Sequence, residues 1–152
     1  MPRAYYSMVI EHSADAVWAA IRPFGHYAWA GVESETIIEE GKADDHVGAV
    51  RHIAMKSGAI RQKLLAHSDI DRSYTYAFCD QAPFPVENYL ATIRILPVVA
   101  DGAAFVEWSA TFDCALSESE RWVAHFEQQG FAKWLSALAQ FMNKTGRDVS
   151  AS

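Results

Sequence analysis

The stretch from residue 117 to about residue 144 limits the possible folds most, because it is long, apolar and helical in its spacing. Ser117 and Glu120 stand three residues apart, which is the spacing of a capping box and predicts that a helix begins there. Gly146 is its predicted end. Large apolar residues recur between these points, at Trp122, Phe126, Phe131, Trp134, Leu135, Leu138, Phe141 and Met142. A helix of about 26 residues is roughly 40 Å long, so we expect the other elements to pack around it.

The preceding residues predict strands joined by short turns, with two short helices near the N-terminus. Ser13 is placed to cap a helix over residues 14–22, which Pro23 ends, and residues 24–29 form a second short helix or an irregular segment. Alternating patterns bounded by turn residues predict seven strands, at residues 5–11, 32–40, 48–55, 60–67, 73–79, 86–99 (broken near Pro97) and 103–114. Short turns favour an antiparallel meander, so the predicted fold class is α+β, with the long helix covering one face of the sheet.

Composition and charge narrow the class of protein. A chain of 152 residues is long enough for one domain, which we assign to residues 1–146, and residues 147–152 are expected to fray. The formal charge of −6, without a basic cluster, argues against nucleic acid or an anionic membrane as partner. Cys79 and Cys114 form no CxxC motif, which suits a reducing compartment. There is no signal-peptide pattern and no apolar run near the ~18 residues of a membrane span, so we expect a cytoplasmic protein. Both a monomer and a homodimer stay open.

Several short motifs carry a resemblance to a known family. They are ADAVW at residues 14–18, VGAVR at 47–51, YTY at 74–76, PVENYLATI at 85–93 and VEWSATF at 106–112. With the order of elements, they resemble the START/Bet v-type helix-grip superfamily, SRPBCC, and within it the polyketide cyclase/dehydratase-like branch related to lachrymatory factor synthase. The resemblance implies a seven-stranded antiparallel sheet curled around the long C-terminal helix, with a hydrophobic cavity between them. It is weak for the reaction, because the superfamily mixes enzymes, transport proteins and ligand sensors.

Strand alternation predicts which side chains face the long helix. The predicted inward sets are Arg51, Ile53 and Met55; Gln62, Leu64 and Ala66; Tyr89, Ala91, Ile93 and Ile95; and Val106, Trp108, Ala110 and Phe112. Arg51, Gln62 and Tyr89 therefore point inward among hydrophobic residues, whereas His52 is expected at the surface. A buried guanidinium is costly unless it is paired or used on a ligand, which makes Arg51 the leading candidate for function.

The resemblance adds a role for Arg51 and shows one departure. In the lachrymatory factor synthase-like branch, the arginine that matches Arg51 lies in the pocket with a glutamate on the next strand. Here Gln62 stands in place of that glutamate; it cannot exchange a proton at neutral pH, but it can orient a carbonyl or hydroxyl group. The predicted catalytic residues are therefore Arg51, Tyr89 and Glu87, with Glu87 at the pocket mouth. Other candidates for proton transfer are Tyr27, His26 and His52.

The aromatic stripe of the long helix is most simply core, but it can also form one wall of a cavity. The residues expected to contact a ligand are Gln62, His26, Tyr27, Trp29, Tyr76, Trp108, Phe112, Phe131, Trp134 and Leu138. No pair of histidines has the four-residue spacing of a helical zinc site, so no metal is expected. The sequence contains no phosphate-binding glycine motif and no G-x-S-x-G motif, which argues against nucleotide binding and against an α/β-hydrolase, and no cofactor is expected.

Three functions remain open. The first is a cofactor-independent lyase, cyclase or dehydratase acting on a small hydrophobic, aromatic or polyketide-like molecule, in which Arg51 stabilises an oxyanion or enolate and Tyr89 or Glu87 moves the proton. The second is a non-catalytic carrier or sensor of an apolar ligand, with Arg51 pairing a carboxylate or phenolate. The third is an interaction protein with a filled core. The loss of an acidic group at Gln62 favours the second function over the first, and the retained Arg51 argues against the third.

Overall fold

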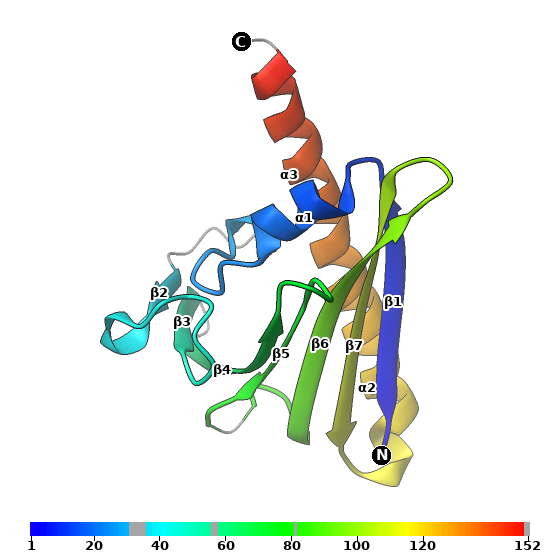
Figure 1. Cartoon of the computed structure of the whole chain (residues 1–152). Coiled ribbons are helices and arrows are strands. Elements are labelled where there is room, and N and C mark those ends of the chain that lie inside the picture. Colours follow the sequence, from blue (N-terminus) through cyan, green and yellow to red (C-terminus); the bar gives the residue numbers. More distant parts are fainter. Residues whose placement is uncertain (31–35, 56–57, 81, 151–152) are drawn as a thin grey trace.

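The computed structural model of the chain describes residues 1–30, 36–55, 58–80 and 82–150. Within these residues, seven strands form one antiparallel sheet in the order β1-β7-β6-β5-β4-β3-β2 (Figure 1). The strands are β1 (Arg3–Ile10), β2 (Thr36–Ile38), β3 (Val50–Met55), β4 (Gly58–Ser68), β5 (Ser73–Phe78), β6 (Glu87–Val98) and β7 (Ala103–Asp113). The predicted α+β class and antiparallel meander are confirmed. The first strand pairs with the last one, so β1 and β2 lie at opposite edges of the sheet.

Two short helices separate β1 from β2, as predicted. Helix α1 (Ala14–Ile21) begins where Oγ of Ser13 accepts a hydrogen bond from the backbone N–H of Ala16 over 3.1 Å. A short 3₁₀ helix, η1 (Ala28–Ala30), follows and packs against the long C-terminal helix. The second predicted strand, over residues 32–40, is only partly correct. Its start lies outside the described residues, β2 covers three residues, and the following residues form a 3₁₀ turn, η2 (Glu39–Gly41).

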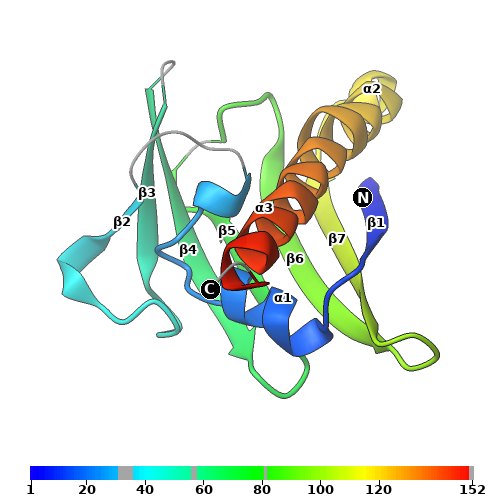
Figure 2. The ribbon, with the colours of Figure 1, turned by 90° about the horizontal axis from the view of Figure 1, so that it is seen from above.

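The C-terminal helix crosses the concave face of the sheet, as Figure 2 shows from above. It consists of the 3₁₀ turn η3 (Leu116–Glu118), helix α2 (Ser119–Ala124), the π-helical segment η4 (His125–Phe131) and helix α3 (Ala132–Ser150). The predicted capping box is wrong, because no side chain caps α2 and the chain enters it through a 3₁₀ turn. Gly146 is not the end either, since α3 includes it.

The π-helical segment explains a spacing that a regular α-helix would not tolerate. Phe126 and Phe131 are five residues apart, which would turn their side chains to different sides of an α-helix. A π-helix has i→i+5 hydrogen bonds, so both side chains can face the sheet. Phe126 is 3% exposed and Phe131 is fully buried. The apolar face of α3 continues from there through Leu135 and Leu138, both fully buried.

Strand alternation predicted most of the core correctly. All four predicted inward residues of β6 and all four of β7 are buried, as are Arg51, Ile53, Gln62 and Leu64. Ala66 was predicted to face inward and is exposed, because the β4–β5 register shifts between Leu64 and Ala66. The predicted break of β6 near Pro97 is also wrong. Pro97 pairs with Ala104 of β7. At this point β6 has run past the end of β5, so its other edge has no strand partner that needs a backbone N–H.

Phe131 and Trp134, three residues apart in the C-terminal helix, differ in burial, and this difference leads to a stability prediction. Phe131→Ala should lower the free energy of unfolding by about 3–5 kcal/mol, the usual loss for a buried aromatic residue. Trp134 packs on Trp108 with ring centroids 5.1 Å apart but is only partly buried, so Trp134→Ala should cost less, about 1–2 kcal/mol. Urea denaturation of both variants measures the two losses. A loss for Trp134→Ala as large as that for Phe131→Ala would contradict this packing.

Candidate functional site

Arg51 lies on β3 with its side chain on the inner face of the sheet and no exposed surface. Strand alternation accounts for this direction, since Ile53 on the same face is also buried and His52 between them is partly exposed. Nε of Arg51 donates a hydrogen bond to Oε1 of Gln62 over 2.7 Å. The two residues are directly opposite each other in the β3–β4 register. The structure therefore brings this predicted pair together.

Three aromatic rings surround the guanidinium group of Arg51. Its Cζ atom lies 4.2 Å from the ring centroid of Phe24, 4.1 Å from that of Tyr27 and 4.9 Å from that of Tyr76. Phe24 and Tyr27 come from the segment between α1 and η1, and the backbone N–H of Phe24 donates to the carbonyl of Asp44 over 3.1 Å. Cation–π attraction partly offsets the cost of removing the charge from water. We call these three rings the aromatic cage.

The charge of Arg51 nevertheless lacks a full set of partners. Its Nη1 and Nη2 atoms are buried without a hydrogen-bond partner among the described residues, and its one bonded partner there, Gln62, is neutral. The buried hydroxyl of Tyr74 on β5 is also without a partner. Unpaired buried donors are costly, and the cost is higher for a charged group. Three such groups near one another identify a place where a polar ligand atom would be strongly favoured.

Burial dominates the protonation of the tyrosines around this site. It raises the pKa values of the hydroxyls of Tyr27, Tyr74, Tyr76 and Tyr89, all well inside the protein. The positive charge of Arg51 lowers each of these pKa values, but by less than burial raises it. Because the Arg51 charge affects each of these pKa values, all four hydroxyls lie near the guanidinium group. The four phenols therefore stay neutral at ordinary pH and can donate hydrogen bonds.

An aromatic column joins the cage to the long helix. Nε1 of Trp108 on β7 donates to the hydroxyl of Tyr76 over 3.2 Å. The ring of Trp108 stacks on Phe131 at 5.2 Å with 15° between the ring planes, and it also contacts Trp29 at 5.9 Å. These rings fill the space between sheet and helix. The helix therefore positions the inner end of the site through Trp108 and Tyr76.

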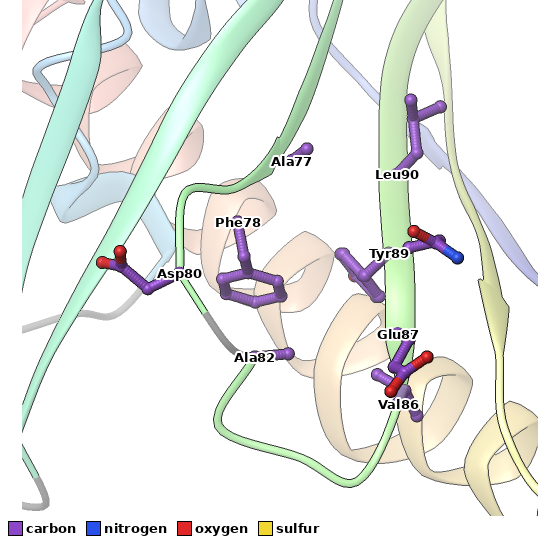
Figure 3. Close-up of a pocket in the computed structure, with 9 residues that line it drawn as sticks. Ala77, Phe78, Asp80, Ala82, Val86, Glu87, Tyr89 and Leu90 are labelled. Atoms are coloured by element: carbon purple, nitrogen blue, oxygen red, sulfur yellow. The ribbon is translucent and has the colours of Figure 1, made fainter.

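A pocket of about 640 Å³ opens between the end of β5 and the start of β6 (Figure 3). Phe78, which lines it, lies directly opposite Gln62 in the β4–β5 register. The rings of Phe78 and Tyr89 point toward each other there, with centroids 5.1 Å apart. Glu87 lies exposed at the rim, where the β6–β7 register shifts and Asn88 has a φ of 55°. Because of this bulge, the side chains of Glu87 and the buried Tyr89 point in different directions, although both residues line the pocket.

Tyr89 connects this pocket to the cage. It lines the pocket and is only 7% exposed. After burial, the neighbouring phenol of Tyr27 is the next contribution that raises the pKa of Tyr89, whereas a hydrogen bond with Tyr76 lowers it. The Tyr89 hydroxyl therefore lies beside two members of the aromatic cage. Of the predicted catalytic residues, Tyr89 is placed between Arg51 and the pocket, and Glu87 is at the outer rim.

The other predicted contact residues are distributed around these two places. Trp29, Phe112 and Leu138 are buried in the core, where Phe112 packs edge-on against Phe126 at 5.0 Å. His26 is exposed, with its ring 6.3 Å from that of Phe141 on α3. Its backbone carbonyl accepts a hydrogen bond from Nε1 of Trp29 over 3.0 Å. The contact of each with a ligand stays a prediction.

Sequence reasoning missed two residues of the site, Phe24 and Tyr74. Tyr74 shares strand parity with Tyr76, so the YTY motif contained the signal that both side chains face inward. Phe24 follows Pro23 in a segment without periodic pattern, and no sequence rule places its ring over Arg51. Among the described residues, no three His, Cys, Asp or Glu side chains gather closely enough to hold a metal ion. None of the described helices has the length and hydropathy that crossing a membrane requires.

Comparison with protein families assigns the chain. The profile described as "Polyketide cyclase / dehydrase and lipid transport" matches residues 1–145. The chain belongs to this family. The predicted resemblance to the SRPBCC superfamily is thereby confirmed, and the family description includes both enzymes and lipid carriers. Comparison with curated proteins gave no match.

Solved structures of the same fold include both bacterial and plant proteins. The protein XoxI from Bacillus cereus is 32% identical with a TM-score of 0.81, over 96% of this chain and 99% of that chain. A structure from Thermobifida fusca is 26% identical with a TM-score of 0.82, over 95% of each chain. Norcoclaurine synthase from Thalictrum flavum, in complex with dopamine and hydroxybenzaldehyde, is 13% identical with a TM-score of 0.72, over 93% of this chain and 86% of that chain. The last likeness concerns the fold alone.

The raised pKa values of the interior tyrosines predict a loss of stability in alkali. Between pH 10 and the higher pKa of each buried phenol, the unfolded chain loses a proton that the folded chain keeps, so stability falls as pH rises. Each such group contributes a loss of up to about 1.4 kcal/mol per pH unit. Absorbance at 295 nm and urea denaturation from pH 8 to pH 12 measure ionisation and stability together. Titration of all six tyrosines near pH 10 in the folded protein would contradict the buried cluster.

Proposed function

We propose that this protein binds a small apolar or aromatic molecule and anchors one of its oxygen atoms at Arg51. The observation that carries the proposal is the fully buried guanidinium group with two unpartnered donor nitrogens inside an aromatic cage. A structural ion pair would supply an acidic partner, and Arg51 has only the amide of Gln62 among the described residues. Such an arrangement holds a charge ready for a ligand at the cost of some stability.

The pocket shown in Figure 3 offers a route to this anchor. Its inner wall is formed by Tyr89 and Phe78, and the Tyr89 hydroxyl lies beside Tyr27 and Tyr76 of the cage. Movement of the Tyr89 and Phe78 side chains would open the pocket toward Arg51. Norcoclaurine synthase, which shares the fold, is described with small aromatic molecules bound, and this supports a ligand of similar character here.

A catalytic role would be that of a cofactor-independent lyase, cyclase or dehydratase. Arg51 would stabilise an enolate or oxyanion, because a fixed positive charge in a dry site is most effective there. Tyr89 would act as a hydrogen-bond donor, since its raised pKa keeps it protonated at neutral pH. Gln62 cannot accept a proton, so the carboxylate of Glu87 at the pocket rim is the base that the chain offers.

A carrier or sensor is the second candidate, and one observation favours it. The guanidinium group has no carboxylate among its described hydrogen-bond partners, so the site is better equipped to hold an oxygen atom than to move a proton. The family description also names lipid transport. Under this alternative, Arg51, Tyr74 and the cage bind the ligand and release it unchanged.

Substitution of Arg51 tests the shared part of both candidates. Arg51→Leu should abolish ligand binding while the protein stays folded, and it should keep or gain stability, because replacing a buried ion by an apolar residue is often stabilising. Arg51→Lys should also impair binding, since lysine cannot reproduce the two-pronged geometry. Arg94→Leu, at an exposed position of β6, is the control. Thermal melting and native mass spectrometry of retained small molecules provide the measurements. Unfolding of Arg51→Leu would identify Arg51 as a structural residue.

Proton transfer separates the enzyme from the carrier. The retained molecule is identified by mass spectrometry, and the complex is then incubated in D₂O to record deuterium at carbon positions next to its carbonyl groups. An enzyme should incorporate deuterium, and Glu87→Gln should slow this by about 100-fold or more without loss of binding. Glu120→Gln, at an exposed position of α2, is the matched control. Absence of exchange in the wild-type complex favours the carrier.

A further inference from the structure

The unpartnered nitrogens of Arg51 indicate which kind of oxygen-containing group the ligand carries. We propose that Arg51 and Tyr74 together form a site for one carboxylate, so that the ligand is an apolar monocarboxylic acid. This inference rests on the function proposed above and assigns Tyr74 as a binding residue. Three observations support it: the donors that are free, the rings that pack around them, and the local charge.

The free donors match the two oxygen atoms of a carboxylate. Nε of Arg51 is occupied by Gln62, so Nη1 and Nη2 are the donors left on the guanidinium group. These two nitrogens form a planar fork, which pairs best with a planar group that has two oxygens. The hydroxyl of Tyr74 makes no hydrogen bond of good geometry and lies close enough to Arg51 to interact with it, so it can supply a third donor to the same ligand group. A ketone or a phenol has a single oxygen and would leave part of this set unpaired.

The aromatic cage restricts the direction of approach. Phe24, Tyr27 and Tyr76 lie over the guanidinium group at centroid distances between 4.1 and 4.9 Å. Because three rings pack this closely around Cζ, a ligand group bound at Arg51 has to be small and flat. A planar carboxylate meets this requirement better than a tetrahedral phosphate or sulfate.

Charge balance points to a monoanion. Among the described residues, Arg51 is the one charged residue that is buried, and the polar residue buried with it is the neutral Gln62. One negative charge neutralises the site, whereas a dianion such as phosphate would leave a buried excess charge. The surrounding walls are aromatic and aliphatic, so the rest of the ligand must be apolar. Gln62 is important here, because a glutamate at this position would neutralise Arg51 from within the protein.

Paired acids and amides test this assignment directly. Benzoate, phenylacetate and hexanoate are titrated at pH 7 against benzamide, phenylacetamide and hexanamide, with thermal shift and ligand-detected NMR as readouts. At least one acid should bind wild-type protein at least about tenfold more tightly than its amide, the scale of a charge-assisted hydrogen bond. Tyr74→Phe should weaken binding of that acid by about tenfold. Tyr6→Phe, at a partly buried tyrosine of β1, is the control and should bind as wild type does.

Gln62→Glu provides the second, independent variant. It supplies an internal carboxylate next to Arg51, so it should abolish acid binding while raising the melting temperature. The assignment is overturned if acids and amides bind equally, if no acid of the three pairs binds, or if Gln62→Glu retains the acid affinity. A further outcome is that acids and amides bind wild-type protein equally well and both lose binding in Arg51→Leu. That result would support the proposed function and would contradict only the assignment of the ligand as a carboxylic acid.

Discussion

The unpaired charge of Arg51 is the constraint on which the site depends. A guanidinium group with no exposed surface is held by one neutral hydrogen bond to Gln62 and by three aromatic rings. Packing of the long helix keeps these rings in place, through Trp108 stacked on Phe131 and bonded to Tyr76. The helix-grip fold therefore does more than enclose apolar volume. Its apolar packing offsets the free-energy cost of holding a buried charge without a full set of partners.

Much of this arrangement was predictable from local periodicity. The period of two correctly turned Arg51 on β3 and Trp108 on β7 toward the core, because a continuous ladder preserves alternation. Tyr89 is also buried, as its parity with Ala91 predicted, although the β6–β7 register shifts beside it. Prediction failed at Ala66, which the register shift after Leu64 turns outward. Phe126 and Phe131 are buried as expected, but the π-helical segment that accommodates the five-residue interval between them was not predicted. That interval is visible in the sequence and is a usable signal for a π-helix.

The remainder of the site could not be predicted, because it depends on tertiary contacts. Phe24 and Tyr27 reach Arg51 from a segment without periodic pattern, positioned in part by the hydrogen bond from Phe24 to Asp44. An unpartnered donor such as the Tyr74 hydroxyl is defined by what its surroundings lack, which sequence alone does not show. The replacement at Gln62 was visible, and its consequence became clear only with the geometry of Arg51.

The most direct test of the account observes the Arg51 guanidinium itself. Side-chain ¹⁵N–¹H NMR of arginine, recorded during a titration with benzoate, resolves Nε and Nη signals of buried and exposed residues. If Arg51 anchors the ligand, its Nη signals should shift and become protected from solvent exchange, whereas those of the exposed Arg94 should not change. Equal responses of both arginines, or unchanged Arg51 signals when benzoate binds elsewhere on the protein, would contradict the claim that Arg51 anchors the ligand.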